Sequence, residues 1–308
     1  MEEHSLLHGD LSEFKDALVE AEKNPRAFFS NAENFRPDKV GRILGVFLNL
    51  SENYEVLKET IVLISKLKRK ENLDDLLDFM MSEKFKDREK FDIINLKTLC
   101  IRAIANYKDK RGIPALLYCL NDKNANYKMR FMAAEALGSI GDENAVDSLI
   151  SIMSDENEKS VYVRESAATA LGMIGDMRAV DAFLSILESK KNFLDKFTFL
   201  KERVIEALGK INFTSSKRVM DAFKNALEDD SAQVRINAVE CIMNSGDENA
   251  YDIIKTKLDD NNEEVIKNVV IALYNLKGRE ALLEIMEDKN IKQSAKDEAK
   301  ELYEEYEE

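Results

Sequence analysis

Apolar residues recur at helical spacing along most of the chain, and short polar stretches divide them into paired segments. Between residues 145 and 153 the apolar side chains fall on one face of a helix. A polar turn follows at 154–160, and the pattern predicts a second helix over 161–174 with small alanines on its inner face. Because alanine has little side chain, a neighbouring helix can approach closely there. The basic unit is therefore predicted to be a pair of helices.

This helix pair is repeated along the chain. The segments 132–142 and 166–176 share the sequence Ala-Ala-x-Ala-Leu-Gly-x-Ile-Gly-Asp, so Ala136 and Ala170 are equivalent and lie 34 residues apart. Glycines gather at the repeat ends, where we expect Gly175-Asp176 to end one helix and cap the next. A period of roughly 31 to 37 residues is typical of stacked helix pairs, which predicts an all-α fold, an α-solenoid. Weaker copies place the equivalent position at Ala103, Ala207, Cys241 and Ala272.

The repeated motif Val163-Arg164-x-x-Ala-Ala-x-Ala-Leu-Gly-x-Ile-Gly-Asp resembles a HEAT repeat, in particular the short HEAT-like repeats of phycobilin lyase subunits. The resemblance is strong over 97–278 and weaker over 40–90. It implies a superhelix of about six or seven HEAT-like helix pairs. We expect three parts, an N-terminal helical cap at 1–38, the repeat solenoid at 39–288 and an acidic C-terminal cap helix at 289–308.

The resemblance also implies a ladder of charges. In HEAT-like repeats a basic residue of the second helix commonly meets an acid from a repeat turn. Partly buried charge pairs of this kind fix register more reliably than they add stability. Ile266 takes the basic position in the last copy, so we expect the ladder to stop before the C-terminal end. The matching basic residues are Arg130, Arg164, Lys201 and Arg235, and the candidate acids are Asp122, Asp155 and Asp229.

The charge balance argues against several classes of protein. With 45 basic and 59 acidic residues the net charge is −14, which repels a nucleic-acid backbone. The absence of tryptophan also sets the chain apart from HEAT-like DNA glycosylases, which grip DNA on a basic concave face. The longest apolar run, 40–50, is too short to span a membrane. Three cysteines without Cys-x-x-Cys spacing, and a start that lacks signal-peptide character, predict a cytoplasmic protein.

Residues for catalysis are scarce. The only histidines are His4 and His8, whose spacing would place both on one helix face, but a solvated terminus is the simpler interpretation. HEAT-repeat hydroxylases bind two irons through repeated His-Glu pairs, and this chain has none, so that activity is not carried over. No glycine-rich phosphate loop and no Ser-His-Asp set is present. We therefore predict no catalytic residue, no cofactor and no metal.

A partner is expected to bind the concave face that the second helices line. Three candidates on this face are Phe131, Met132 and Glu135, which neighbouring repeats could instead cover. Arg203 and Glu206 follow in the same register two repeats later.

A second candidate surface is the one place where the repeat period grows, between Ala170 and Ala207. The additional residues fall in 189–199, a segment that contains Phe193, Phe197 and Phe199. Insertions in repeat proteins often map to a binding face, so these rings could form an aromatic knob for a partner. The alternative is that they extend the second helix and pack on neighbouring repeats.

These observations predict a non-enzymatic scaffold or adaptor that binds a protein partner, as part of a larger complex. The preformed surface would lose little entropy on binding. Two alternatives stay open: an accessory subunit for assembly or cofactor maturation of an enzyme complex, and an enzyme of the HEAT-repeat hydroxylase or lyase kind. The sequence identifies neither the partner nor the oligomeric state.

Overall fold

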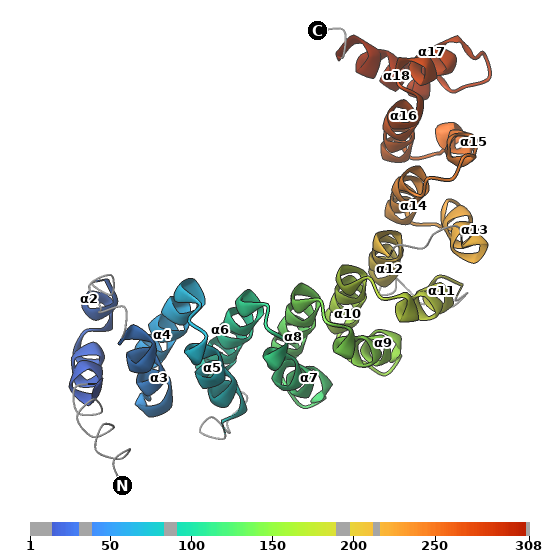
Figure 1. The fold of residues 1–308 in the computed structure, drawn as a ribbon. Helices are drawn as coiled ribbons and strands as arrows, with labels where there is room; N and C mark the ends of the chain where they lie inside the picture. The colour runs from blue at the N-terminus through green and yellow to red at the C-terminus, as the bar shows by residue number, and fades with distance from the viewer. Residues whose placement is uncertain (1–13, 31–38, 83–90, 189–197, 212–215, 306–308) are drawn as a thin grey trace. The chain divides into compact units, whose positions relative to one another are not determined.

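The computed structural model describes residues 14–30, 39–82, 91–188, 198–211 and 216–305 (Figure 1). These residues form helices and turns, with no strand among them. The chain divides into two compact units, Met1–Ser148 and Leu149–Glu308. The all-α prediction is confirmed.

Unit 1 is a stack of helix pairs. The second helices α4, α6 and α8 contact one another in order, and the first helices α3, α5 and α7 do the same, which makes two parallel rows (Figure 1). Residues 14–23 are helical, and Leu18 and Ala21 pack against Phe47 and Val56 of the first pair. The bounds are α2 (Pro25–Ser30), α3 (Val40–Leu50), α4 (Tyr54–Leu67), α5 (Glu71–Met81), α6 (Phe91–Tyr107), α7 (Ile113–Asn121) and α8 (Tyr127–Ile140).

Unit 2 repeats this arrangement. Its second helices α10, α12, α14, α16 and α18 contact one another in order, and α18 also packs on α17. The first helices are α9 (Val146–Ser154), which crosses the unit boundary, α11 (Val180–Glu188), α13 (Lys217–Ala226), α15 (Ala250–Lys255) and α17 (Arg279–Glu287). The second helices are α10 (Val161–Ile174), α12 (Thr198–Lys210), α14 (Ala232–Asn244), α16 (Glu263–Lys277) and α18 (Gln293–Glu305). Each unit thus has the stacked pairs of an α-solenoid, while the expected cap boundaries stay predictions.

The turns between repeats explain why glycine and aspartate recur there. Gly141 and Gly175 have φ angles of 77° and 74°, the left-handed conformation that ends α8 and α10. The next residue, Asp142 or Asp176, accepts a hydrogen bond from the main-chain N–H two positions later, at 2.9 and 2.8 Å. Short 3-10 helices then lead into the following first helix. One glycine and one carboxylate therefore reverse the chain direction at equivalent places.

Close packing between second helices depends on small residues, as the alanine pattern predicted. Ala167, Ala168 and Ala170 are fully buried in α10. Gly172, also inside α10, lies so close to α12 that an added Cβ would be 2.7 Å from the Cα of Ala207. The two helices are in direct contact. This packing places consecutive second helices next to one another.

Candidate partner-binding surface

The predicted surface residues of unit 2 lie on α12. Phe199, in the first turn of this helix, keeps 59% of its surface exposed. Arg203 Nη1 contacts Glu206 Oε2 at 2.8 Å, and Lys210 Nζ contacts Glu206 Oε1 at 2.7 Å. Hydrogen bonds from Lys210 and Arg203 hold the pKa of Glu206 below its usual range, against the opposing effect of burial. Glu206 therefore engages both basic side chains of this helix face.

The other two phenylalanines of the proposed aromatic knob, Phe193 and Phe197, lie outside the described residues. The knob as a cluster of three rings stays a prediction, and so does its alternative. Phe199 itself belongs to α12, because that helix begins at Thr198.

The predicted surface residues of unit 1 lie on α8. Phe131 and Met132 are half-buried, and Glu135 lies one turn further along the helix. Burial raises the pKa of Glu135, and Arg102 of α6 opposes that shift. The role of these three residues in binding stays a prediction.

The basic residues of the expected charge ladder make polar contacts in both units, while the pairing of Arg130 and Arg164 with Asp122 and Asp155 stays a prediction. Arg130 and Arg164 are buried, and the Nε of each donates to a main-chain carbonyl of the first helix in the same pair. Arg130 reaches the oxygen of Leu120 at 2.8 Å, and Arg164 reaches that of Met153 at 2.7 Å. Burial lowers the pKa of Arg164, although acids of the turn before α10 raise it.

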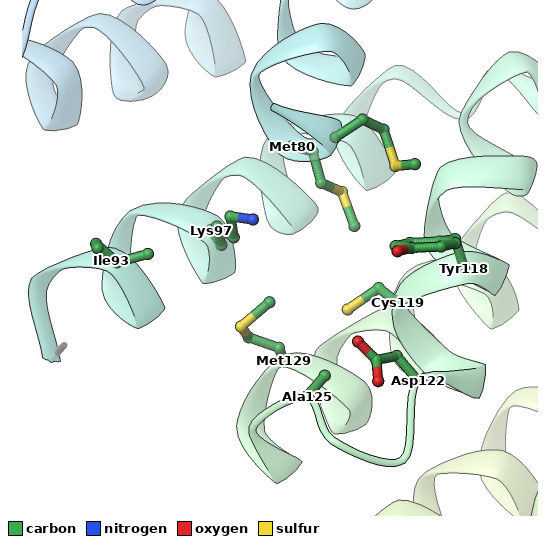
Figure 2. Close-up of a pocket in the computed structure, with 9 residues that line it drawn as sticks. Met80, Ile93, Lys97, Tyr118, Cys119, Asp122, Ala125 and Met129 are labelled. Carbon is green, nitrogen blue, oxygen red and sulfur yellow. The ribbon is translucent and has the colours of Figure 1, made fainter. Parts of the chain in front are cut away.

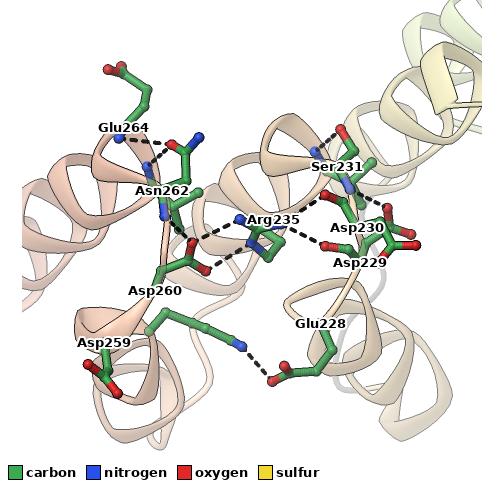
Figure 3. A network of polar contacts seen from close by, with 12 residues as sticks. Glu228, Asp229, Asp230, Ser231, Arg235, Asp259, Asp260, Asn262 and Glu264 are labelled. Carbon is green, nitrogen blue, oxygen red and sulfur yellow. Dashed lines mark hydrogen bonds and ion pairs between the residues drawn. The ribbon is translucent and has the colours of Figure 1, made fainter. Parts of the chain in front are cut away.

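Between later repeats the ladder crosses from one pair to the next. Lys201 Nζ contacts Asp229 Oδ2 at 3.1 Å. Arg235 binds both oxygens of Asp260, at 2.9 and 2.8 Å, and also donates to the main-chain oxygen of Asp229 (Figure 3). Asp260 is absent from the acids predicted from the sequence. Its separation from Arg235 along the sequence is nevertheless similar to that between Lys201 and Asp229. That spacing was the signal that could have found it.

One small apolar cavity lies among the helices of unit 1. Met80, Cys119 and Met129 point toward the same space (Figure 2). Its volume is about 40 Å³, whereas sites for drug-sized ligands measure roughly 300 to 1,000 Å³. The cavity is therefore too small to hold a cofactor.

The described residues contain no obvious centre for metal or thiol chemistry. No cluster of three or more His, Cys, Asp or Glu side chains suited to a metal ion occurs among them. Burial raises the pKa of Cys100, and it raises the pKa of Cys241 to about 12, which keeps both thiols protonated at neutral pH. His4 and His8 lie outside the described residues. Within the part of the chain that the structure describes, no helix combines the length and apolar character needed to cross a membrane.

Stacked helix pairs, repeated turns and closely packed second helices define a helical-repeat protein. The sequence profile for HEAT repeats matches residues 94–161, 195–274 and 220–299, together more than half of the chain. The profile for the PBS lyase HEAT-like repeat matches residues 163–189. The chain belongs to the HEAT-repeat family, as the resemblance predicted.

Similar solved structures include three natural proteins. The complex of CpcE and CpcF of phycocyanin lyase from Nostoc sp. PCC7120 is 18% identical, with 86% of this chain and 94% of that chain covered and a TM-score of 0.46. Human deoxyhypusine hydroxylase is also 18% identical, with 86% and 96% covered and a TM-score of 0.38. The Escherichia coli protein YibA is 14% identical, with 90% and 97% covered and a TM-score of 0.48. The comparison with curated protein sequences finds no match.

Proposed function

We propose that this chain is a non-enzymatic, cytoplasmic scaffold or adaptor that binds a protein partner on its second helices. The observation that carries the proposal is the exposure of large apolar side chains on α10 and α12. Tyr162, Met173 and Phe199 keep 62%, 51% and 59% of their surface exposed. Aromatic residues and methionine are enriched in protein interfaces, and hot spots cluster around such anchors. Shape and these anchors, rather than a reacting group, supply the proposed function.

The experiment is affinity purification of the full chain from its native organism, followed by mass spectrometry. The test variant carries Tyr162→Ser with Phe199→Ser, and the control carries Tyr118→Ser. Tyr118 is also an exposed aromatic, at 57%, but it lies on the first helix α7. We expect a stoichiometric partner that the control retains and the test variant loses, with unchanged circular dichroism in both. A partner retained equally by all three proteins would contradict a site on α10 and α12.

A second candidate function is an accessory subunit that assists assembly or cofactor maturation of an enzyme complex. The match of residues 163–189 to the PBS lyase HEAT-like repeat favours it. The test compares the activity of the co-purified complex with and without this chain. Lower activity after removal, restored when the chain is added back, supports the accessory role. Unchanged activity, with the partner still bound in the control, supports the plain adaptor.

A further inference from the structure

The turns that follow α4 and α6 concentrate positive charge in unit 1. The stretches 65–71 and 106–111 hold seven basic residues and two acids, in a chain whose net charge is −14. We call the exposed side chains of these two stretches the basic edge. Its five lysines are all exposed, and none of them forms an ion pair with another residue that the structure describes. They are Lys66, Lys68, Lys70, Lys108 and Lys110.

Hydrogen bonds hold the two turns side by side. Tyr107 Oη donates to the main-chain oxygen of Arg69 at 2.9 Å. Asn106 Nδ2 donates to Ser65 Oγ at 2.7 Å. Helices α4 and α6, which lead into these turns, are also in direct contact (Figure 1). The lysines of both turns therefore belong to one surface that exists before any partner binds.

The acids of this surface lie against its two arginines. Arg111 Nη1 is 3.0 Å from Asp74 Oδ1, and Arg111 Nη2 is 3.0 Å from Asp109 Oδ2. Arg69 Nη1 is 3.9 Å from Glu71 Oε1. These contacts tie the arginines to the protein itself. The charges that are available to a ligand are therefore those of the lysines.

Two of the lysines adopt a backbone conformation that costs free energy. Lys68 and Lys108 directly follow α4 and α6 and have φ angles of 51° and 50°, and they are the non-glycine residues with positive φ among those described. Gly141 and Gly175 take the same place after α8 and α10. Glycine fits this left-handed region better than lysine, because it has no Cβ. Strain that glycine would relieve indicates a function for the lysine side chains.

The surroundings of the basic edge favour a short segment of protein over a long polyanion. Leu67 lies between two of the lysines and keeps 40% of its surface exposed, which offers an apolar contact beside the charges. The turn of the next pair, 141–145, packs on α7 as the turn after α6 does, and it carries two acids and no basic residue. A nucleic acid or a membrane surface that extends past the edge would meet these acids. A segment of a few residues would not reach them.

We propose that the basic edge binds a short acidic segment of a protein partner, in which Asp or Glu side chains flank one apolar residue. The carboxylates pair with Lys68, Lys108 and the neighbouring lysines, and the apolar residue covers Leu67. This surface is separate from the exposed side chains of α10 and α12, so the inference goes beyond the scaffold function proposed for those helices. Because hydrogen bonds already fix the two turns, binding orders little of the protein.

The test measures binding of short fluorescein-labelled peptides to the full chain by fluorescence polarisation. The first peptide has acidic residues on both sides of a leucine, the second has serine in place of the leucine, and the third has lysines in place of the acids. We expect the first peptide to bind at least about threefold more tightly than the second, and the third not to bind. Failure of the first peptide to bind would overturn the proposal.

Two other polyanions are measured in the same way, by competition with the first peptide. They are a short DNA duplex and vesicles that contain phosphatidylserine. We expect both to compete more weakly than the unlabelled peptide does. Stronger competition by the duplex or the vesicles would assign the basic edge to a different class of partner and would contradict the proposal.

Variants of the chain separate the site from general charge. Lys68→Gln with Lys108→Gln is expected to weaken binding of the first peptide about tenfold. The control, Lys217→Gln with Lys224→Gln, removes the same charge from two exposed lysines of α13 that also form no ion pair with a described residue. It should change the affinity less than twofold. Equal losses for the two double variants would reduce the effect to net charge.

A glycine variant separates binding from folding. In Lys68→Gly with Lys108→Gly the strain at positive φ is relieved, so we expect Tm to rise by at least about 2 °C. The affinity for the first peptide should nevertheless fall about tenfold, as in the glutamine variant. A lowered Tm would show that the lysines stabilise the turns, which removes the argument from strain. An unchanged affinity would show that these two lysines take no part in binding.

Discussion

The guanidinium groups of Arg130 and Arg164 bind main-chain oxygens at the C-terminal ends of α7 and α9. The last carbonyls of a helix have no partner within that helix, so each arginine satisfies one of them. The sequence pattern could locate these arginines, because they recur with the period of the repeat. It could not identify their acceptors, since every residue has a carbonyl and only the folded turn selects one.

Removing one side of the Arg235–Asp260 pair should destabilise the protein strongly. The side chains are 14% and 6% exposed, so Asp260→Ala would leave a buried guanidinium without its carboxylate. We expect a loss of about 3 kcal/mol in the free energy of unfolding, measured by urea titration. The control is Asp259→Ala, which removes an 82% exposed carboxylate and should cost under about 0.5 kcal/mol. Similar losses for the two variants would contradict a special role for the buried pair.

The same pair should make stability depend on pH. Burial alone would raise the pKa of Asp260, but hydrogen bonds from Arg235 and the Asn262 N–H bring it below its usual value. Because the pKa is lower in the folded state, the pair stabilises the protein fully above the unfolded-state pKa of about 4. This stabilisation is lost as the pH falls through the folded-state pKa. The stability difference between the wild type and Asp260→Asn should therefore shrink between pH 6 and pH 3 in urea titrations. A difference that grows on acidification would contradict this assignment.

At the scale of elements, the helix pairs were predictable because apolar periodicity and the glycine–aspartate turns repeat along the chain. The role of Gly172 could not be predicted from the sequence. It recurs with the same period as the glycines that end helices, but it lies inside α10 and packs against Ala207 of α12. A sequence pattern shows that a small residue is needed there, and only the neighbouring helix shows why. The candidate surface was partly predictable, since Phe199 belongs to the aromatic segment, whereas the exposure of Tyr162 and Met173 on α10 depends on how the neighbouring helices pack.

Gly172→Ala tests this contact directly. Alanine favours a helix over glycine by about 1 kcal/mol, so an uncrowded position would gain stability. Here the new methyl group would meet the backbone of α12, and we expect a net loss of about 1–3 kcal/mol in urea unfolding. Gly175→Ala is the comparison, because no atom lies within 4 Å of its added Cβ and only its positive φ opposes the change. A stabilised Gly172→Ala variant would show that the helices can separate without cost.

For the whole molecule, the net charge of −14 could be read from composition, and with it the expectation that a partner is basic. The identity of a partner could not be read from the sequence, because the family's stacked helices support many functions and the site depends on surface residues.

The charge also predicts how binding should respond to salt. Association of the native partner with the chain should slow at least about fivefold when ionic strength rises from roughly 0.05 to 0.5 M, while dissociation changes less. Stopped-flow fluorescence measures both rates. The same partner bound to Glu240→Gln, which lacks one exposed charge, provides the control, with a slightly smaller salt effect. An association rate independent of salt would indicate that long-range attraction contributes nothing.

The two kinds of ladder contact differ in how they would survive duplication of a repeat. Arg130 and Arg164 each bind a carbonyl of their own helix pair, so a duplicated gene segment carries donor and acceptor together. Lys201 binds Asp229 of the following pair. Arg235 binds Asp260 of the following pair and also the main-chain oxygen of Asp229 in its own pair. A copy inserted next to them would need a matching neighbour. The nearly identical segments 132–142 and 166–176 lie where these arginine–carbonyl contacts join the two helices of one pair, and this part of the chain is the best place to lengthen the array by design.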